Sequence, residues 1–343
     1  MGLEVVLADT LGHSLVLVTG ATGAVGPLVV AAFHEAGYRV RTLSLSFPSA
    51  VDWPDDVEIM TGDVTDLAVV QRAVQGVDAV VHLAALLHVV NPPLSLRERY
   101  ERINVGGTAN VVAGACRAGV RRIVFFSTIA VYGSSSGGFL TEEATPQPVT
   151  LYARTKLTAE RAVLEARDPD GRPIGVVLRL GSVYGSRVKG NYRTLARLLA
   201  RGRFIPLGSG ANRRTLIYDR DVVSAALLAT THPDAGGRVF NVTDGQVHTV
   251  KAIIATLCAA LGRRPPRLVL PVGPVRGLVG FVETGARICG VQPPLTRVTI
   301  DTYTEDVAVA GERFRKELGF VPQYDLAAGW RETVARMRQA GEL

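Results

Sequence analysis

The chain has 343 residues, of which 47% are apolar and 20% charged, and its formal net charge is +7. This length and apolar content allow a large buried core, which predicts one large domain or two coupled ones. Its three cysteines, Cys116, Cys258 and Cys289, lie far apart without a C-x-x-C spacing. Their spacing argues against a disulfide framework and a zinc site, so we expect a reduced, cytoplasmic protein with no metal.

Short apolar runs alternate with helical stretches through the first half of the chain. Buried strands are expected at residues 15–18, 38–43, 57–60, 79–83, 123–127 and 175–180. Helices are expected after the first strand through about residue 36, and over residues 105–118 and 151–166. The alternation predicts an α/β protein with a Rossmann-type, doubly wound parallel sheet, in which ligands bind at the carboxyl ends of the strands.

The first predicted strand runs into a glycine-rich turn that opens a helix, with Gly20, Gly23 and Gly26 three residues apart. Glycines permit a tight turn and let a phosphate approach the backbone, and the helix N-terminus supplies N–H donors. This arrangement predicts a dinucleotide site. At the end of the second strand, where a carboxylate would hold the ribose of NAD, the chain has Ser44, and no arginine follows to bind a 2′-phosphate. The cofactor is therefore NAD or NADP, with a slight preference for NADP. Asp63, after the third strand, either meets the adenine or caps a turn.

Tyr152 and Lys156 lie four residues apart on a predicted helix and so share one face. Tyrosine alone is a poor base near neutral pH, and an adjacent ammonium group stabilises its anion. Thr128, at the end of the fifth strand, is placed to hydrogen-bond the reacting oxygen. These three residues are the predicted catalytic groups, and His82 is expected to end the fourth strand in a structural role.

The pattern changes after residue 180, where loops rich in Gly, Pro and Arg begin. Residues 239–242 are expected to return to the main sheet as a further strand. We therefore expect a nucleotide-binding domain of residues 1–180 and 214–247, and a smaller, discontinuous C-terminal substrate domain of residues 181–213 and 248–343.

Basic residues concentrate between positions 179 and 220, where only Asp219 opposes them. They are Arg179, Arg187, Lys189, Arg193, Arg197, Arg201, Arg203, Arg213, Arg214 and Arg220. We interpret Arg197, Arg201 and Arg203 as residues of solvated helix faces. For the basic residues as a set, the more specific interpretation is a binding site for an anionic ligand such as a diphosphate. No nucleic-acid recognition motif appears in the chain, so nucleic acid is not expected as a partner. The apolar stretch 268–291 carries charges and is interpreted as a packed helix with its approach loop. A membrane contact is the lesser alternative, and no membrane partner is expected.

Seven motifs together resemble the extended short-chain dehydrogenase/reductase family, which includes nucleotide-sugar epimerases and dehydratases. They are TGATGAVG from Thr19, GDVTD from Gly62, HLAA from His82, INVGGTANV from Ile103, STIAVYG from Ser127, YARTK from Tyr152 and RLGSVYG from Arg179. The resemblance implies that Thr128, Tyr152 and Lys156 form the catalytic triad. It also implies cofactor contacts from Gly20, Thr22, Gly23, Ala24, Val25, Gly26, Ser44, Asp63, Val64, Leu83, Ala84, Ala85, Asn104, Tyr152 and Lys156.

The stretches beginning at Arg187 and Pro206 resemble a subgroup that acts on UDP- or dTDP-sugars, comprising 4-epimerases and 4-keto reductases. That resemblance implies substrate contacts from His88, Thr128, Lys189, Asn191, Arg213 and Arg214. Related 4,6-dehydratases carry an Asp-Glu pair after the catalytic threonine, where this chain has Ile129 and Ala130. These residues cannot move protons, so we expect no dehydration.

The favoured function is hydride transfer at C4 of a nucleotide sugar, as an epimerase or a reductase. The alternative is dehydrogenation of an apolar hydroxy or keto substrate such as a steroid or flavonoid. A non-enzymatic, cofactor-sensing role is less favoured because both Tyr152 and Lys156 are present. The resemblance also implies a homodimer formed through the helices at residues 105–118 and 151–166.

Overall fold

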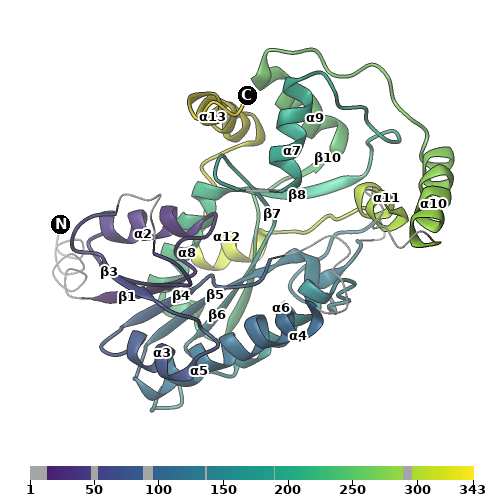
Figure 1. Ribbon diagram of the computed structural model, residues 1–343. Helices are drawn as coiled ribbons and strands as arrows, with labels where there is room; N and C mark the ends of the chain where they lie inside the picture. The colour runs from purple at the N-terminus through teal and green to yellow at the C-terminus, as the bar shows by residue number, and fades with distance from the viewer. Residues whose placement is uncertain (1–13, 48–52, 88–95, 136, 189, 289–295) are drawn as a thin grey trace.

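The computed structural model describes residues 14–47, 53–87, 96–135, 137–188, 190–288 and 296–343. Its largest element is a seven-stranded sheet in the order β3-β2-β1-β4-β5-β6-β9 (Figure 1). All its neighbouring strands are parallel. The strands are β1 (Leu15–Thr19), β2 (Arg39–Ser44), β3 (Glu58–Thr61), β4 (Ala79–His82), β5 (Arg122–Thr128), β6 (Gly175–Leu180) and β9 (Arg238–Val242). The strand order reverses between β1 and β4, and ligands of such sheets bind at this point.

Continuous apolar runs form the centre of this sheet, because both of its faces are covered. All five residues of β1 and all six of β6 are buried. Val16 lies opposite Val40 of β2 and Ala79 of β4. The six strands expected in the first half of the chain are confirmed to within one residue, and the strand expected at 239–242 is β9, parallel to β6.

Helices cover both faces of the sheet (Figure 1). Side chains of α2 (Gly26–Glu35), α8 (Asp219–Thr231) and α12 (Glu312–Leu318) share one apolar core with it. Those of α3 (Leu67–Ala73), α5 (Thr108–Arg117) and α6 (Leu151–Leu164) share the core of the opposite face. The short elements are α4 (Leu96–Tyr100), the π-helix η1 (Glu101–Gly107) and the 3₁₀ helices η2 (Ile129–Tyr132) and η3 (Pro233–Ala235).

A second, three-stranded sheet in the order β10-β8-β7 lies above the main sheet (Figure 1). It consists of β7 (Ser182–Tyr184), β8 (Arg213–Tyr218) and β10 (Val247–Thr249). Its core is shared with α7 (Asn191–Ala200), α9 (Val250–Leu261) and α13 (Leu326–Gln339). Two further helices, α10 (Val272–Ile288) and α11 (Arg297–Thr304), pack together over Leu207.

The predicted domain boundary between residues 213 and 214 falls within β8. The sequence pattern assigned residues 214–247 to the nucleotide domain, yet β8 pairs with β7 and β10 of the small sheet. The α8 and β9 segments that follow pack with the main sheet. The exact domain bounds therefore stay a prediction. None of the helices in the described ranges is long and apolar enough to cross a membrane.

Candidate active site

The glycine turn between β1 and α2 is packed so closely that side chains have no room there. Gly20 has φ +70° and its N–H donates to the Leu43 carbonyl at 2.8 Å. A Cβ on Gly20 would lie 2.7 Å from the backbone nitrogen of Ala84, and one on Gly26 would lie 2.3 Å from the Ala21 carbonyl oxygen. No side chain caps the N-terminus of α2. The turn therefore offers backbone N–H groups and a helix dipole to an anion, which fits a dinucleotide pyrophosphate.

The neighbouring loops are fixed by contacts of their own. The Ser44 hydroxyl accepts a hydrogen bond from the Thr22 N–H at 3.2 Å. Asp63 accepts from the Thr65 N–H at 2.9 Å, so the turn role expected of this carboxylate is present. Val64 packs against Gly107, where an added Cβ would lie 2.7 Å from a Val64 methyl. The contacts expected between the cofactor and Ser44, Asp63 or Val64 stay predictions.

His82 is buried at the end of β4 and bridges three elements. Its Nδ1 lies 2.6 Å from Thr19 Oγ1, and its Nε2 lies 3.0 Å from Thr108 Oγ1. Because the Thr108 hydroxyl donates to the Asn104 carbonyl at 2.7 Å, it accepts from Nε2–H, and Nδ1 accepts from Thr19. Burial, together with a smaller effect of the nearby Lys156, lowers the pKa of His82 to about 3. His82 is therefore a neutral structural group at neutral pH.

Asn104 anchors the loop that follows β4 and contains the predicted cofactor contacts Leu83, Ala84 and Ala85. Its side chain accepts from the Leu86 N–H at 2.7 Å and donates to the Leu86 carbonyl at 3.2 Å. It also donates to Thr155 Oγ1 on α6 at 3.1 Å. Asn104 lies in the π-helix η1, an irregularity that often marks functional sites. Its own contact with a cofactor stays a prediction.

The three predicted catalytic residues come from α6 and from the carboxyl end of β5. Thr150 caps α6 by accepting from the Ala153 N–H at 3.1 Å, which places Tyr152 and Lys156 on the first turns of the helix. The Lys156 ammonium donates to the Phe126 carbonyl at 2.6 Å and lies 4.3 Å from the centre of the Phe125 ring. Thr128 is the last residue of β5 and its hydroxyl accepts from the Ala130 N–H at 3.1 Å. The Lys156 side chain of α6 is thus hydrogen-bonded to β5 at a position two residues before Thr128.

Burial shifts both titratable groups of this pair toward their neutral forms. It lowers the pKa of Lys156 to about 7, against the opposing effect of the Glu160 carboxylate. It raises the pKa of Tyr152 well above its usual value, with a smaller contribution from Tyr100 in the same direction. Tyr152 is therefore protonated at neutral pH in the protein alone, and Lys156 is close to half charged. Additional positive charge near the phenol would lower its pKa.

A buried ion pair beside this site was not anticipated from the sequence. Glu160 accepts from Arg179 Nη2 at 2.6 Å and from Arg179 Nε at 3.1 Å, and the side chains are 1% and 6% exposed. The Ser127 hydroxyl also donates to Glu160. Arg179 therefore does not belong to an anion site. The available signal was an acidic residue four positions after Lys156, on the face of the helix that must be buried.

The predicted substrate residues are dispersed. His88 and Lys189 lie outside the described residues, and Asn191 is the exposed first residue of α7. Arg213 forms an ion pair with Asp306 at 2.6 Å. Arg214 donates to the carbonyl oxygens of Thr302 at 2.6 Å and Tyr303 at 3.0 Å. Arg214 thus holds the last turn of α11 and Arg213 the chain that follows it, and their contact with a substrate stays a prediction.

Known proteins resemble the chain over most of its length. The model of the NAD dependent epimerase/dehydratase family matches residues 16–243. A UDP-glucose 4-epimerase of Vibrio cholerae is 28% identical over 95% of this chain and 96% of its own length. A 3β-hydroxysteroid dehydrogenase/Δ5→4-isomerase of Mycobacterium tuberculosis is 28% identical over 90% of this chain and 86% of its own. The solved structure of MoeE5 in complex with UDP-glucose and NAD has a TM-score of 0.74 at 24% identity, and covers 95% of this chain and 99% of that one.

The chain therefore belongs to the NAD-dependent epimerase/dehydratase family, and the resemblance found in its motifs is confirmed. The Rossmann-type fold is confirmed as well. A nicotinamide dinucleotide fits the turn at Gly20, because the uncapped N-terminus of α2 leaves backbone N–H groups for its pyrophosphate. In the part of the chain that the structure describes, no three His, Cys, Asp or Glu side chains are grouped to hold a metal.

Proposed function

We propose that this protein moves a hydride at C4 of a UDP- or dTDP-sugar, as a 4-epimerase or a 4-keto reductase. One observation carries the proposal: α6 supplies both Tyr152 and Lys156, and Lys156 is tied to β5 two residues before Thr128. The glycine turn lies on the same sheet, at the carboxyl end of β1. NAD or NADP bound there would accept or supply the hydride. The 4-epimerase of Vibrio cholerae supports the substrate class.

The residues divide the remaining chemistry among them. Tyr152 would exchange a proton with O4 of the sugar, and Thr128 would hydrogen-bond that oxygen and orient it. A protonated Lys156 would stabilise tyrosinate, so the charge on this lysine controls the pKa of the phenol. Because the pKa of Lys156 is about 7, its charge and the activity are both expected to change near neutral pH.

Dehydration is not part of the proposal. A 4,6-dehydratase must remove a C5 proton and protonate the departing C6 hydroxyl, which requires two acid–base groups beside the threonine. Ile129 is buried and Ala130 is exposed, and neither side chain carries a proton that can be exchanged.

Two observations favour a second candidate, the dehydrogenation of an apolar hydroxy or keto substrate. The first is that Arg213 and Arg214 are engaged with residues 302–306 rather than held free for a diphosphate. The second is the Mycobacterium tuberculosis relative, whose name refers to a 3β-hydroxysteroid. Both candidates use Tyr152 and Lys156 in the same way, so they differ only in what binds above Thr128.

Turnover of both substrate classes tests the proposal. UDP-glucose, UDP-N-acetylglucosamine and a 3β-hydroxysteroid are each incubated with the protein and with NAD or NADP, and the products are identified by NMR. Tyr152→Phe should bind cofactor as before but lose most turnover. Tyr38→Phe is the matched control, since Tyr38 directly precedes β2 at the amino end of the sheet. Steroid turnover without sugar turnover would favour the second candidate, and unchanged turnover by Tyr152→Phe would refute the mechanism.

The cofactor carried by freshly purified protein separates epimerase from reductase. An epimerase recycles its cofactor, so stoichiometric NAD(H) released on denaturation would support that activity. Little bound cofactor, together with binding of added NADPH, would support a reductase. We also propose that the protein is a homodimer through α5 and α6, which light scattering on the purified chain would test.

A further inference from the structure

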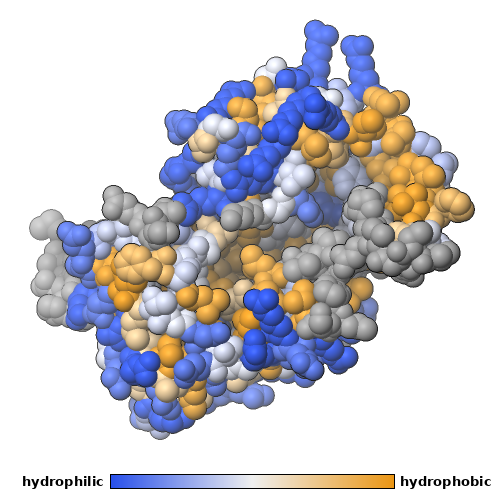
Figure 2. All heavy atoms as spheres, viewed as in Figure 1, coloured by the Kyte–Doolittle hydropathy of each residue, from blue (hydrophilic) through white to orange (hydrophobic). Residues whose placement is uncertain are grey.

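Helix α10 carries a second apolar face besides the one it buries. Val275 and Val279 pack with Leu207 and with Ile300 of α11. The next stripe around the helix holds Leu278, Phe281 and Val282, which are 66%, 79% and 46% exposed. A helix at a protein surface normally presents polar residues outside its buried stripe. Figure 2 shows hydrophobic side chains gathered at the right edge of the molecule, where Figure 1 places α10.

The segment that leads into α10 continues this surface. Leu268 and Val269 are 61% and 47% exposed. The segment is held in place, because the Leu270 N–H donates to the Pro206 carbonyl and the Gly208 N–H donates to the Leu270 carbonyl, both at 2.9 Å. Its apolar side chains are therefore presented by a fixed backbone.

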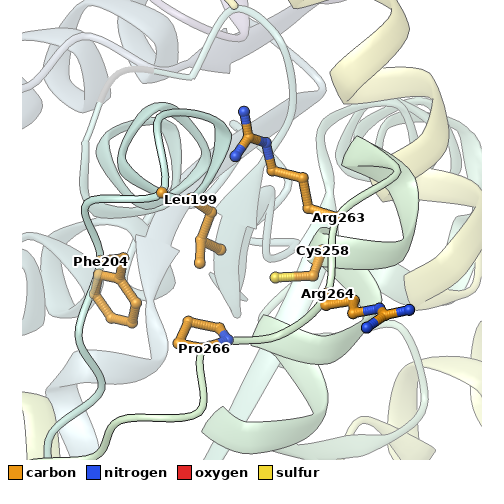
Figure 3. A pocket seen from close by; sticks show the side chains of 7 residues that line it. Leu199, Phe204, Cys258, Arg263, Arg264 and Pro266 are labelled. Carbon is orange, nitrogen blue, oxygen red and sulfur yellow. The ribbon is translucent and has the colours of Figure 1, made fainter.

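Arg263, Arg264 and Arg267 directly precede this apolar segment in the chain, and no acidic residue lies among them. From residue 245 to residue 282 the chain has no aspartate or glutamate. The exposed arginines at the ends of α7 and α9 make no ion pair with any acidic residue that the structure describes; they are Arg201, Arg203, Arg263, Arg264 and Arg267. Figure 3 shows Arg263 and Arg264 beside a pocket whose other labelled side chains are Leu199, Phe204, Cys258 and Pro266. Arginines thus adjoin apolar groups here, whereas Arg276 of α10 is paired with Asp301 at 2.7 Å.

We propose that this surface docks onto an anionic lipid bilayer. The docking surface consists of the apolar residues Leu268, Val269, Leu278, Phe281 and Val282 and the arginines Arg201, Arg203, Arg263, Arg264 and Arg267. Its apolar side chains enter the boundary between head groups and acyl chains, and its arginines meet the lipid phosphates. The five arginines have no acidic partner among the described residues, and their positive charge matches an anionic surface. The helix lies on the membrane and does not cross it, since α10 is too short and too polar for a span.

Docking would also place the candidate active site near the lipid. Helix α10 packs on α11, and Glu283 of α10 accepts from the N–H of Arg297 at 3.1 Å. The residues that end and follow α11 are the ones that bind Arg213 and Arg214. One helix layer therefore separates the docking surface from the predicted substrate residues. The proposal does not depend on which substrate is used.

Co-sedimentation of the full chain with vesicles tests the proposal. We expect binding to vesicles of phosphatidylcholine with 30% phosphatidylglycerol, and much weaker binding to pure phosphatidylcholine. Leu278→Ser/Phe281→Ser should weaken binding to the anionic vesicles by about 100-fold, because two large side chains lose their burial. Arg264→Gln/Arg267→Gln should weaken it by roughly 30-fold at low salt. Val321→Ser is the matched control, since Val321 is 59% exposed on the loop before α13.

Three results would overturn the proposal. One is absence of binding by the wild-type protein to the anionic vesicles. The second is equal binding by the wild type and Leu278→Ser/Phe281→Ser, which would mean that general basicity is responsible. The third is a wild-type oligomer that becomes a smaller species in the Leu278→Ser/Phe281→Ser variant, with vesicle binding unchanged. That result would assign this face to contact with a second copy of the chain. A Phe281→Trp variant gives an independent measurement: its emission should shift to the blue with anionic vesicles, and no shift would exclude insertion.

Discussion

Glu160→Gln removes one charge from the ion pair beneath the candidate active site and leaves its volume unchanged. The Arg179 guanidinium then stays buried with a neutral partner, since Arg179 is only 5% exposed. The Ser127 hydroxyl loses the carboxylate to which it donates. Lys156 loses the anion that opposes the effect of burial on its pKa. The substitution therefore changes both the stability of the fold and the charge of Lys156, a predicted catalytic residue.

Breaking a buried pair by removing one partner costs about 3–5 kcal/mol of unfolding free energy. Unfolding entropy is about 2.1 cal/mol/K per residue, so this chain of 343 residues should have about 0.7 kcal/mol/K. The expected fall in melting temperature is therefore about 4–7 °C. The pKa of Lys156 should also fall below its present value of about 7, and the loss of activity that accompanies its deprotonation should move to lower pH.

Thermal unfolding and a pH–activity profile measure the two effects. The matched control is Glu165→Gln, which removes a carboxylate from the exposed C-terminal end of the same helix. Arg179→Met alone should be as damaging as Glu160→Gln, and the double variant should be less destabilised than the sum of the two. Additive losses, or a Glu160→Gln melting temperature equal to that of Glu165→Gln, would refute this account of the pair.

Three further predictions follow from particular contacts. Gly20→Ala should reduce cofactor affinity and stability more than Gly171→Ala, measured by calorimetric titration and by denaturation. The φ angles are similar, +70° at Gly20 and +79° at Gly171, but of these two positions only Gly20 has backbone atoms where an added Cβ would lie. The pKa of His82 is about 6.5 in the unfolded chain and about 3 in the folded protein, so the free energy of unfolding decreases as pH drops below 6.5. Between pH 7 and pH 5, urea denaturation should show that the wild type loses about 2 kcal/mol more of this free energy than His82→Asn. If Arg213 binds a diphosphate, Arg213→Ala should raise KM for a nucleotide sugar, whereas Asp306→Asn, which frees the guanidinium, should leave KM unchanged or lower; equal increases would assign the pair to holding residues 302–306.

The main sheet could be predicted because its strands are buried on both faces and are therefore continuously apolar. Residues 15–18 and 175–180 are runs of this kind, and the strands were located to within one residue. Strand β8 was not recognised, because two of its six residues are arginines and its partners β7 and β10 are three residues each. Such short strands carry little periodic signal, and they are set by the packing of α7, α9 and α13 around them.

The candidate site divides in the same way. Four-residue spacing on a helix places Tyr152 and Lys156 on one face whatever surrounds them, and a glycine turn after a buried strand is a local pattern. The family was therefore accessible from motifs alone. The partners of the charged groups were not, because ion pairs join residues that are distant in sequence. Arg179 and Arg213 carry the same charge in the printed sequence, and only packing assigns the first to Glu160 and the second to Asp306.

The sequence by itself determined the parallel sheet, the glycine turn and the shared helix face of Tyr152 and Lys156, because each depends on neighbouring residues whose spacing matches a helix or a strand. Only the tertiary structure decided which charges are neutralised and which apolar residues stay exposed. The sequence does not distinguish an apolar helix residue that faces the core, such as Val279, from one that faces solvent, such as Phe281. The distinction depends on which other elements reach that face, and those contacts are made by chain segments far apart in sequence.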